Sequence, residues 1–385
     1  MNRAFALALA FAACDAPVSS PILDGGATAP DLARADGPST MPSPTVFRVH
    51  YPAGAHTISI RGSTGPLDWY HGQPMLAGAD DTWTFSTGAI DSPVEWKPLI
   101  DDQTWSRGPN YRANPGDTVD VYPHFINASG QVVVLFQSFH SQYLPDDRTV
   151  WAYLPPSYGE NARARYPVLY MHDGQNLFDP SLAFGGIEWG VDETLDAGAE
   201  DGSIAETLVI GIGNTQARIY EYTPTDGGMG GGGGDLYLKL IASELKPAVD
   251  GTLRTNPAVD ATGIMGSSLG GLISAYAGTT RPDVFGRVGA MSPSTWWDND
   301  VIVTDVAATK GKPEPLRVYV DSGDSGTSND DVTDTNILAQ TYLNIGFSAG
   351  NDFLHVVQPG GQHNEFYWAE RLPASFRFLL GPRIQ

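Results

Sequence analysis

The chain is poor in positive charge, in cysteine and in long apolar runs. Its 385 residues include 22 Lys and Arg against 44 Asp and Glu, which gives a formal net charge of −22. A field of that sign repels phosphate backbones and anionic lipids, so nucleic-acid binding and docking on membranes by charge are excluded. The sequence has no run of 18 or more apolar residues, so it predicts no membrane-spanning helix. The single cysteine leaves no partner for an intrachain disulfide and no cysteine cluster for a metal.

The composition nevertheless predicts a folded chain. Hydrophobic residues make up 41% and aromatic residues 10%, which is enough to bury a sizeable core. A soft prior of about 150 residues per domain gives two or three domains for this length. Glycine and proline are frequent, with 44 and 29 residues, but they stay below the level of a low-complexity chain. Wholesale disorder is therefore excluded.

The first fourteen residues predict an export signal. One positive charge at Arg3 precedes the apolar run 4–13, and Cys14 follows two alanines. This order is typical of a secretory signal. Cys14 resembles the modified cysteine of bacterial lipoproteins, which implies cleavage before it and lipidation of its sulfur. We expect a periplasmic or cell-surface lipoprotein whose lipid anchor is its one membrane contact. Ordinary cleavage near Ala13 or Ala16 is the alternative and leaves a secreted protein.

Two segments of different character follow. Residues 15–44 are rich in Pro, Ser, Ala, Asp and Gly without apolar periodicity, and they predict a flexible linker. In residues 45–126, short runs such as 46–50 and 56–60 alternate with period two between turn-forming clusters. This pattern predicts a small β-sandwich. The stretch 95–116 resembles immunoglobulin-like domains that precede many catalytic domains, which implies an immunoglobulin-like sandwich. Aromatic residues in it are expected mostly in the core, with stacking on sugars or an aromatic ligand as the alternative. They include Trp69, Tyr70, Trp83, Trp96 and Trp105.

Residues 127–385 predict an α/β domain with a mostly parallel central sheet. Apolar runs without alternation are typical of strands that are buried on both faces. Such runs alternate here with helical segments at 236–249, 272–277 and 365–380, as an α/β fold requires. The runs are 132–136, 149–154, 167–171, 208–212, 264–265, 288–291 and 316–320.

Ser268 is the candidate nucleophile. The pentapeptide 266–270, Gly-Ser-Ser-Leu-Gly, matches G-x-S-x-G and lies between the apolar run 261–265 and a helical segment. A sharp strand-to-helix turn needs small flanking residues, because the serine backbone is strained there. The turn lifts the hydroxyl clear of the sheet, and the helix N-terminus beyond it favours negative charge.

A serine hydroxyl needs a base to become nucleophilic at neutral pH. Of the eight histidines, His363 is placed best, since it follows the predicted strand 353–357 through the loop 359–362. Histidine in a loop at the carboxyl end of a late strand suits the chain order Ser, Asp, His that α/β-hydrolases use. His355, inside that strand, is expected to be packed. His363 is therefore the predicted base.

The acid that orients the histidine is predicted in the loop 321–331, which follows the strand 316–320. We choose Asp330, because its position leaves slack for the carboxylate to reach the histidine, and Asp331 and Asp324 are its rivals. A calcium loop is the alternative reading of these carboxylates, although their spacing matches no EF-hand.

Acyl transfer also needs donors for an oxyanion. One is the backbone N–H of Leu269, directly after the serine, and the other is predicted to be the N–H of Gln175 in the loop 172–176. Adjacent His172 and Asp173 at a strand end rarely converge on a metal ion. Three side chains are predicted to line the substrate pocket, with structural packing as the alternative: Arg218, Trp296 and Trp297.

Five stretches of the sequence together carry a family resemblance: 171–179, 188–189, 266–271, 292–294 and 360–365. They resemble an esterase family that includes enterochelin esterases, feruloyl and acetyl-xylan esterases, esterase D and the mycolyltransferases. The resemblance covers about residue 131 to the C-terminus, and the order of sandwich and hydrolase is similar to that of enterochelin esterases in particular. It implies an α/β-hydrolase that cleaves carboxylic esters with Ser268 and His363 and needs no cofactor.

The ester itself stays open at this point. Siderophore lactones, feruloylated or acetylated glycans and simple carboxylic esters all suit the motifs. An acyltransferase with the same triad, an inactive surface-binding lipoprotein and a peptidase of the same fold are the alternative functions.

Overall fold

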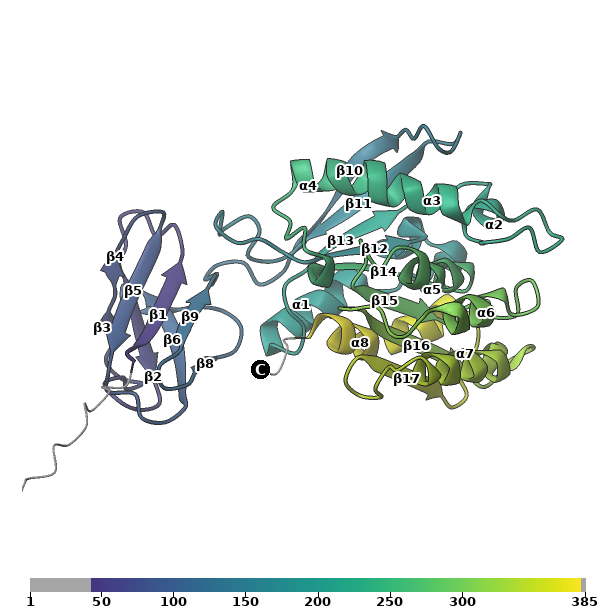
Figure 1. Ribbon diagram of the computed structural model, residues 1–385. Coiled ribbons are helices and arrows are strands. Elements are labelled where there is room, and N and C mark those ends of the chain that lie inside the picture. The colour runs from purple at the N-terminus through teal and green to yellow at the C-terminus, as the bar shows by residue number, and fades with distance from the viewer. Residues whose placement is uncertain (1–42, 382–385) are drawn as a thin grey trace, which may run out of the picture. The chain divides into compact units, whose positions relative to one another are not determined.

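A computed structural model describes residues 43–381 (Figure 1). The predicted signal, its Cys14 and the predicted linker up to residue 42 lie outside the described residues, so export and lipidation stay predictions. Within 43–381, no helix combines the length and the hydrophobicity that crossing a bilayer requires.

The region 45–121 contains nine strands, β1 to β9, which form two sheets. One sheet has the order β4-β5-β1-β9, and the other has the order β3-β2-β6-β7 with β8 paired to β6. Phe47 of one sheet and Ile60 and Trp96 of the other are fully buried in one shared core. Tyr70 and Trp105 are instead 81% and 38% exposed. That this sandwich is immunoglobulin-like stays a prediction. Its strands are β1 (Thr45–His50), β2 (Ile58–Gly62), β3 (Gln73–Pro74), β4 (Leu76–Ala77), β5 (Thr82–Thr87), β6 (Val94–Ile100), β7 (Thr104–Trp105), β8 (Tyr111–Ala113) and β9 (Thr118–Val121).

The rest of the chain forms an eight-stranded sheet of order β10-β11-β13-β12-β14-β15-β16-β17. β11 pairs antiparallel with β10 and β13, and all other neighbours are parallel, which confirms the prediction of a mostly parallel sheet. The strands are β10 (Gln131–Phe139), β11 (Arg148–Leu154), β12 (Val168–His172), β13 (Leu208–Ile212), β14 (Thr262–Ser267), β15 (Arg287–Met291), β16 (Arg317–Gly323) and β17 (Phe353–Gln358).

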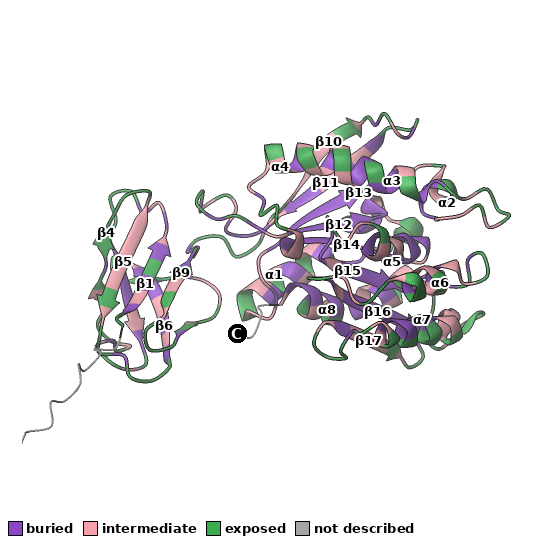
Figure 2. Cartoon of the chain, in the orientation of Figure 1, coloured by how far each residue is buried: buried purple, intermediate pink, exposed green. Residues whose placement is uncertain are grey.

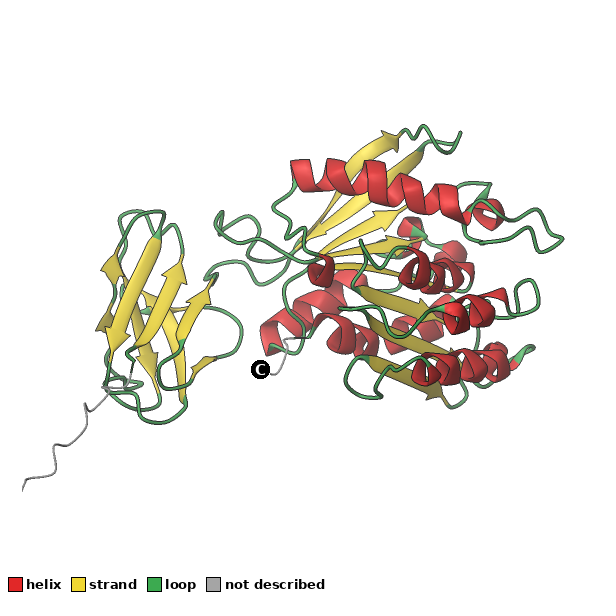
Figure 3. Ribbon diagram, viewed as in Figure 1, coloured by secondary structure: helices red, strands yellow, loops and turns green. Residues whose placement is uncertain are grey.

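Helices cover both faces of this sheet (Figure 3). α1 and α8 pack on one face, and α3 to α7 pack on the other. The α-helices are α1 (Val191–Asp201), α2 (Arg218–Glu221), α3 (Gly234–Leu240), α4 (Lys246–Thr252), α5 (Leu269–Thr280), α6 (Val301–Ala308), α7 (Val332–Asn344) and α8 (Glu365–Leu380). Short 3₁₀ turns are η1 (Gly174–Asn176), η2 (Phe184–Gly186), η4 (Val259–Ala261) and η5 (Asn329–Asp331), and the π-helical turn η3 (Ile241–Leu245) joins α3 to α4.

Burial on both faces explains why the central strands lack an alternating pattern. All five residues of β12 are buried, as the colouring of the central strands also shows (Figure 2). Leu169 and Met171 face the core under α1 and α8, whereas Val168 and Tyr170 face the other core. Because β12 to β17 run parallel, the loops that follow them all emerge at one edge of the sheet, where ligands bind in open α/β folds.

The outermost strand β10 is irregular. Its register against β11 shifts between Val134 and Phe136, and again between Phe136 and Phe139. Val134 is half exposed, and β10 has a neighbouring strand on one side only. Shifts of this kind are β-bulges, which bend a strand and increase its twist.

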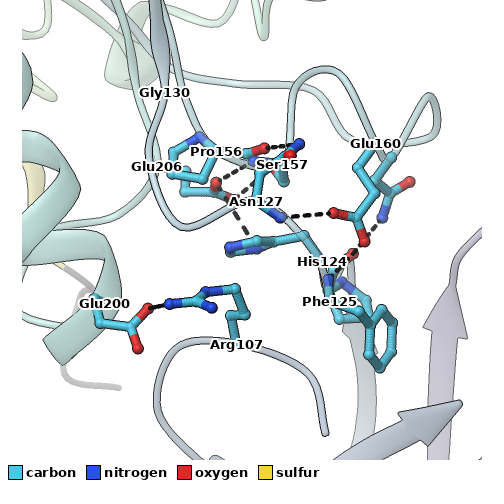
Figure 4. A network of polar contacts seen from close by, with 12 residues as sticks. Arg107, His124, Phe125, Asn127, Gly130, Pro156, Ser157, Glu160, Glu200 and Glu206 are labelled. Atoms are coloured by element: carbon cyan, nitrogen blue, oxygen red, sulfur yellow. Dashed lines mark hydrogen bonds and ion pairs between the residues drawn. The ribbon is translucent and has the colours of Figure 1, made fainter. Parts of the chain in front are cut away.

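The segment that leads from β9 into β10 is held by hydrogen bonds to a neighbouring loop. The Glu160 carboxylate accepts the N–H groups of Phe125 and Ile126 at 2.6 and 3.0 Å, and Asn127 donates its side-chain amide to the Pro156 carbonyl at 3.2 Å (Figure 4). A loop with paired backbone groups avoids the cost of burying them unpaired.

Candidate active site

Ser268 occupies a sharp turn between β14 and α5. Its φ of 58° and ψ of −124° lie in a region of backbone conformation that residues other than glycine rarely adopt. Such backbone strain is expected of a nucleophile at a strand-to-helix turn. A Cβ on Gly266 would lie 2.8 Å from the His172 ring and 3.0 Å from the Gly270 backbone, so only glycine fits. The Ser268 N–H donates to the Met291 carbonyl at 3.0 Å, which ties the turn to β15.

The three residues predicted as a catalytic triad come together in space. His363 Nε2 lies 2.9 Å from Ser268 Oγ, and His363 Nδ1 lies 2.6 Å from Asp330 Oδ1. An ionised carboxylate can only accept, so Nδ1 carries the proton and Nε2 is free to accept the proton of Oγ. The imidazole is 34% exposed and Asp330 is fully buried. Ser294 Oγ, 3.3 Å from Ser268 Oγ, is a further neighbour of the nucleophile.

Of the three candidate acids, only Asp330 contacts the histidine. Asp324 accepts the Gly360 N–H at 2.7 Å, and Asp331 accepts the Trp296 N–H at 3.4 Å. Burial raises the pKa of Asp330, but hydrogen bonds from His363, Ser292 and a backbone N–H outweigh it, so its pKa lies below the usual value. The carboxylate is therefore ionised at neutral pH.

The predicted acid loop is shorter than its sequence indicated. Residues 321–323 belong to β16, and Asp321 is fully buried in it. The apolar pattern ends at Val320, but the strand continues because the carboxylate of Asp321 forms a buried ion pair with Arg371. A hydrophobic pattern does not reveal such a pair.

The loop after β12 carries the second predicted oxyanion donor. Asp173 has a left-handed backbone, with φ of 55°, and leads into η1, which contains Gln175. A Cβ on Gly174 would lie 2.5 Å from the Gly211 backbone, so this loop approaches β13 closely. Leu269 is the first residue of α5. Both residues thus follow the expected strands, and their role as oxyanion donors stays a prediction.

Arg218 is paired within the protein. Its guanidinium donates two hydrogen bonds of 2.8 Å to Asp173, and Asn214 donates a third to the same carboxylate at 2.6 Å. Burial raises the pKa of Asp173, but the hydrogen bond and charge of Arg218 outweigh it and lower the pKa overall. The helix of Arg218 is anchored by the fully buried pair of Glu221 and Arg148. Arg218 therefore holds the loop after β12, and a direct contact with substrate stays a prediction.

The two tryptophans predicted to line the pocket differ. Trp296 is 47% exposed, whereas Trp297 is 1% exposed and donates its indole N–H to the Thr225 carbonyl at 3.1 Å. The expectation that Trp297 lines a pocket is therefore wrong, because its ring is part of the core. The two rings lie side by side, with centroids 5.8 Å apart, so the Trp296 ring covers the buried ring of Trp297 from the solvent side, which their sequence positions alone do not indicate.

His172 lies beneath the nucleophile and is not part of the relay. It is fully buried, with Nδ1 2.9 Å from the Tyr237 hydroxyl and Nε2 3.1 Å from the Ser274 hydroxyl. Burial lowers its pKa to about 3, so this imidazole is neutral. Within residues 43–381, no group of three or more His, Cys, Asp or Glu side chains is arranged to hold a metal ion.

Comparison with known proteins places the site in a family context. A family model described as Putative esterase matches residues 141–379. The uncharacterised protein YbbA of Bacillus subtilis (strain 168) is 27% identical over 258 residues, 63% of this chain and 96% of that protein. The iron(III) enterobactin esterase of Dickeya dadantii (strain 3937) is 25% identical over 316 residues, 78% of this chain and 63% of that protein.

The fold is also found among solved structures. The enterobactin esterase FES from Shigella flexneri, crystallised in the presence of enterobactin, aligns with a TM-score of 0.51 and 16% identity. The alignment covers 87% of this chain and 92% of that chain. At this identity the likeness concerns the fold alone.

Proposed function

This chain belongs to the Putative esterase family and is a carboxylic ester hydrolase, and from that premise we propose that it works as a serine enzyme through Ser268, His363 and Asp330. The observation that carries the proposal is the continuous relay of 2.9 Å from Oγ to the imidazole and 2.6 Å from the imidazole to the carboxylate. An intact relay on a strained turn is what nucleophilic catalysis by serine requires.

In the proposed mechanism, His363 Nε2 accepts the proton of Ser268 Oγ while Oγ attacks the ester carbonyl carbon. The N–H groups of Leu269 and Gln175 stabilise the oxyanion of the tetrahedral intermediate. Buried Asp330 stabilises the imidazolium, which then donates its proton to the leaving alkoxide. Water, deprotonated by the same imidazole, attacks the acyl-enzyme, and the imidazolium then donates its proton to Ser268 Oγ as the bond between Oγ and the acyl carbon breaks and the acid leaves.

We propose a siderophore ester as the substrate. Two relatives carry such substrates in their names, the iron(III) enterobactin esterase of Dickeya dadantii and a siderophore triacetylfusarinine C esterase of Aspergillus fumigatus. The latter is 28% identical over 159 residues, 39% of this chain. Ser268 and His363 follow β14 and β17, at the edge of the sheet where ligands bind in open α/β folds.

The serine mechanism is tested with Ser268→Ala and a p-nitrophenyl ester. We expect kcat to fall about 10⁶-fold, and a fluorophosphonate probe to label the wild-type protein but not the variant. Ser267→Ala, which removes the other hydroxyl of the same turn, is the control and should keep both turnover and labelling. Unchanged turnover by folded Ser268→Ala would refute the mechanism. Hydrolysis of the p-nitrophenyl ester without cleavage of any siderophore ester would refute the substrate but leave the mechanism standing.

A further inference from the structure

The acid of the site has a second oxygen that the mechanism above leaves unused. While Oδ1 of Asp330 contacts His363, Oδ2 accepts the Ser292 hydroxyl at 2.7 Å and the backbone N–H of Gly323. Ser292 directly follows β15 and is fully buried, with a φ of 36°. Its own N–H donates to the carbonyl and to Oδ1 of Asp321 at 2.9 and 3.0 Å. A strained backbone held by two such bonds brings the hydroxyl to the acid.

Helix α8 occupies the other side of the Ser292 hydroxyl. Trp368 Nε1 donates to Ser292 Oγ at 3.0 Å, and Arg371 Nη2 donates to it at 2.7 Å. These two side chains are three residues apart, so they lie on one face of the helix. A hydroxyl has two lone pairs and one proton. With both lone pairs engaged by α8, the proton is left for Asp330 Oδ2.

Arg371 is itself held in place by partners on β16 and β17. Its Nε lies 3.1 Å from Asp321 Oδ2, and its Nη1 donates to Gln358 Oε1 at 2.9 Å. Its Nη2 is also 3.5 Å from Asp330 Oδ2. Tyr319 completes the shell by donating its hydroxyl to Asp321 Oδ2 at 2.8 Å. The Arg371 guanidinium thus lies beside two buried carboxylates, those of Asp321 and Asp330. These contacts fix the orientation of the guanidinium and direct Nη2 at Ser292 Oγ.

We propose that Ser292 is a positioning residue for ester hydrolysis, oriented by Trp368 and Arg371. Its proton on Oδ2 stops the Asp330 carboxylate from turning and reserves Oδ1 for His363. The same helix also fixes the base, since the Trp368 ring meets the imidazole edge to face at 5.1 Å and 83°. This inference rests on the proposed function, because it needs Asp330 to orient His363.

A double-mutant cycle tests whether Ser292 acts through Asp330. We expect Ser292→Ala to lower kcat/KM for a p-nitrophenyl ester about tenfold, as the loss of one charge-assisted hydrogen bond predicts. In the Asp330→Ala background the same change should cost less than about twofold, because residues that act as a unit are not additive. A merely structural role would give the same factor in both backgrounds, so that result would overturn the proposal.

Ser322→Ala is the matched control. Ser322 lies on β16 beside Asp321, is fully buried, and its hydroxyl has no hydrogen-bond partner among the described residues. Its removal should leave kcat/KM unchanged. Loss of activity in Ser292→Ala equal to that in Ser322→Ala would also overturn the proposal.

Trp368→Phe gives a second route should Ser292→Ala fail to fold. This change keeps an aromatic ring beside His363 but removes the indole N–H that donates to Ser292. We therefore expect a loss of about two- to threefold in kcat/KM. The loss should vanish in the Asp330→Ala background, and its persistence there would contradict the inference. If Asp330→Ala itself keeps full activity, the proposed triad is wrong, which distinguishes that failure from a failure confined to Ser292.

Discussion

His172 ends β12 and His363 follows β17, so the two imidazoles lie at the same edge of the sheet. Their surroundings differ in every other respect. His172 is fully buried between two neutral hydroxyls, whereas His363 is partly exposed and paired with a buried carboxylate. Burial disfavours the imidazolium of His172, and the charge of Asp173 offsets only part of that cost. His363 instead has the Asp330 carboxylate 2.6 Å from its Nδ1.

The comparison shows that the neutral histidine has a task of its own. Its ring leaves no room for a side chain at Gly266, and Ser274, which contacts its Nε2, donates to the Gly270 carbonyl at 2.7 Å. Both glycines flank the nucleophile. His172 therefore packs against the glycines of the turn and supports its backbone, while His363 contacts the hydroxyl of Ser268 itself.

The largest expected difference between the two histidines concerns catalysis. His363→Ala should lower kcat for a p-nitrophenyl ester by about 10⁶-fold, because the nucleophile loses its base. The free energy of unfolding should change little, since the imidazole is partly exposed. Steady-state kinetics and urea unfolding of the same preparation measure both. Activity within tenfold of wild type would show that another group is the base.

A smaller effect is expected for the buried histidine, and it concerns stability. His172→Phe keeps an aromatic ring but removes the imidazole that contacts the Tyr237 and Ser274 hydroxyls, so the free energy of unfolding should fall by about 1–3 kcal/mol. Tyr170→Phe on the same strand is the control, because the Tyr170 hydroxyl is buried with no hydrogen-bond partner among the described residues. Equal stability of the two variants in urea unfolding would mean that the His172 contacts contribute nothing.

The smallest effect is the dependence of stability on pH. The pKa of His172 is about 3 in the folded protein, against an ordinary value of 6.5 for histidine, so between these values the unfolded chain binds more protons. Stability should therefore fall as the pH drops below 6.5, by about 1.4 kcal/mol per pH unit from this group. The difference in unfolding free energy between wild type and His172→Phe should shrink by that amount from pH 6 to pH 5. A constant difference would contradict a neutral buried imidazole.

The sequence was sufficient to predict those features that depend on a local pattern of residues. The unalternating runs predicted the parallel sheet, and the strand-to-helix glycines around Ser268 predicted the turn that the structure contains. His363 and Asp330 were predicted as base and acid because each follows a recognisable strand. Their atoms meet as predicted, although they lie 33 residues apart in the chain.

Contacts that depend on packing could not be read from the sequence. Ser292 and Arg371 are 79 residues apart, and neither carries a local pattern that predicts their meeting. Asp321 was assigned to a loop because a carboxylate inside a buried strand makes sense only with Arg371 in place. Trp296 and Trp297 likewise needed the turn geometry before their opposite environments could be told apart.

The bulges of β10 have a consequence for how molecules of this protein meet one another. An outermost strand offers unpaired N–H and C=O groups, which make it a template for adding a strand from a second chain. Two breaks in register within nine residues interrupt that row of groups. A second copy could pair with only a few residues at a time, so this margin of the sheet is protected against edge-to-edge aggregation.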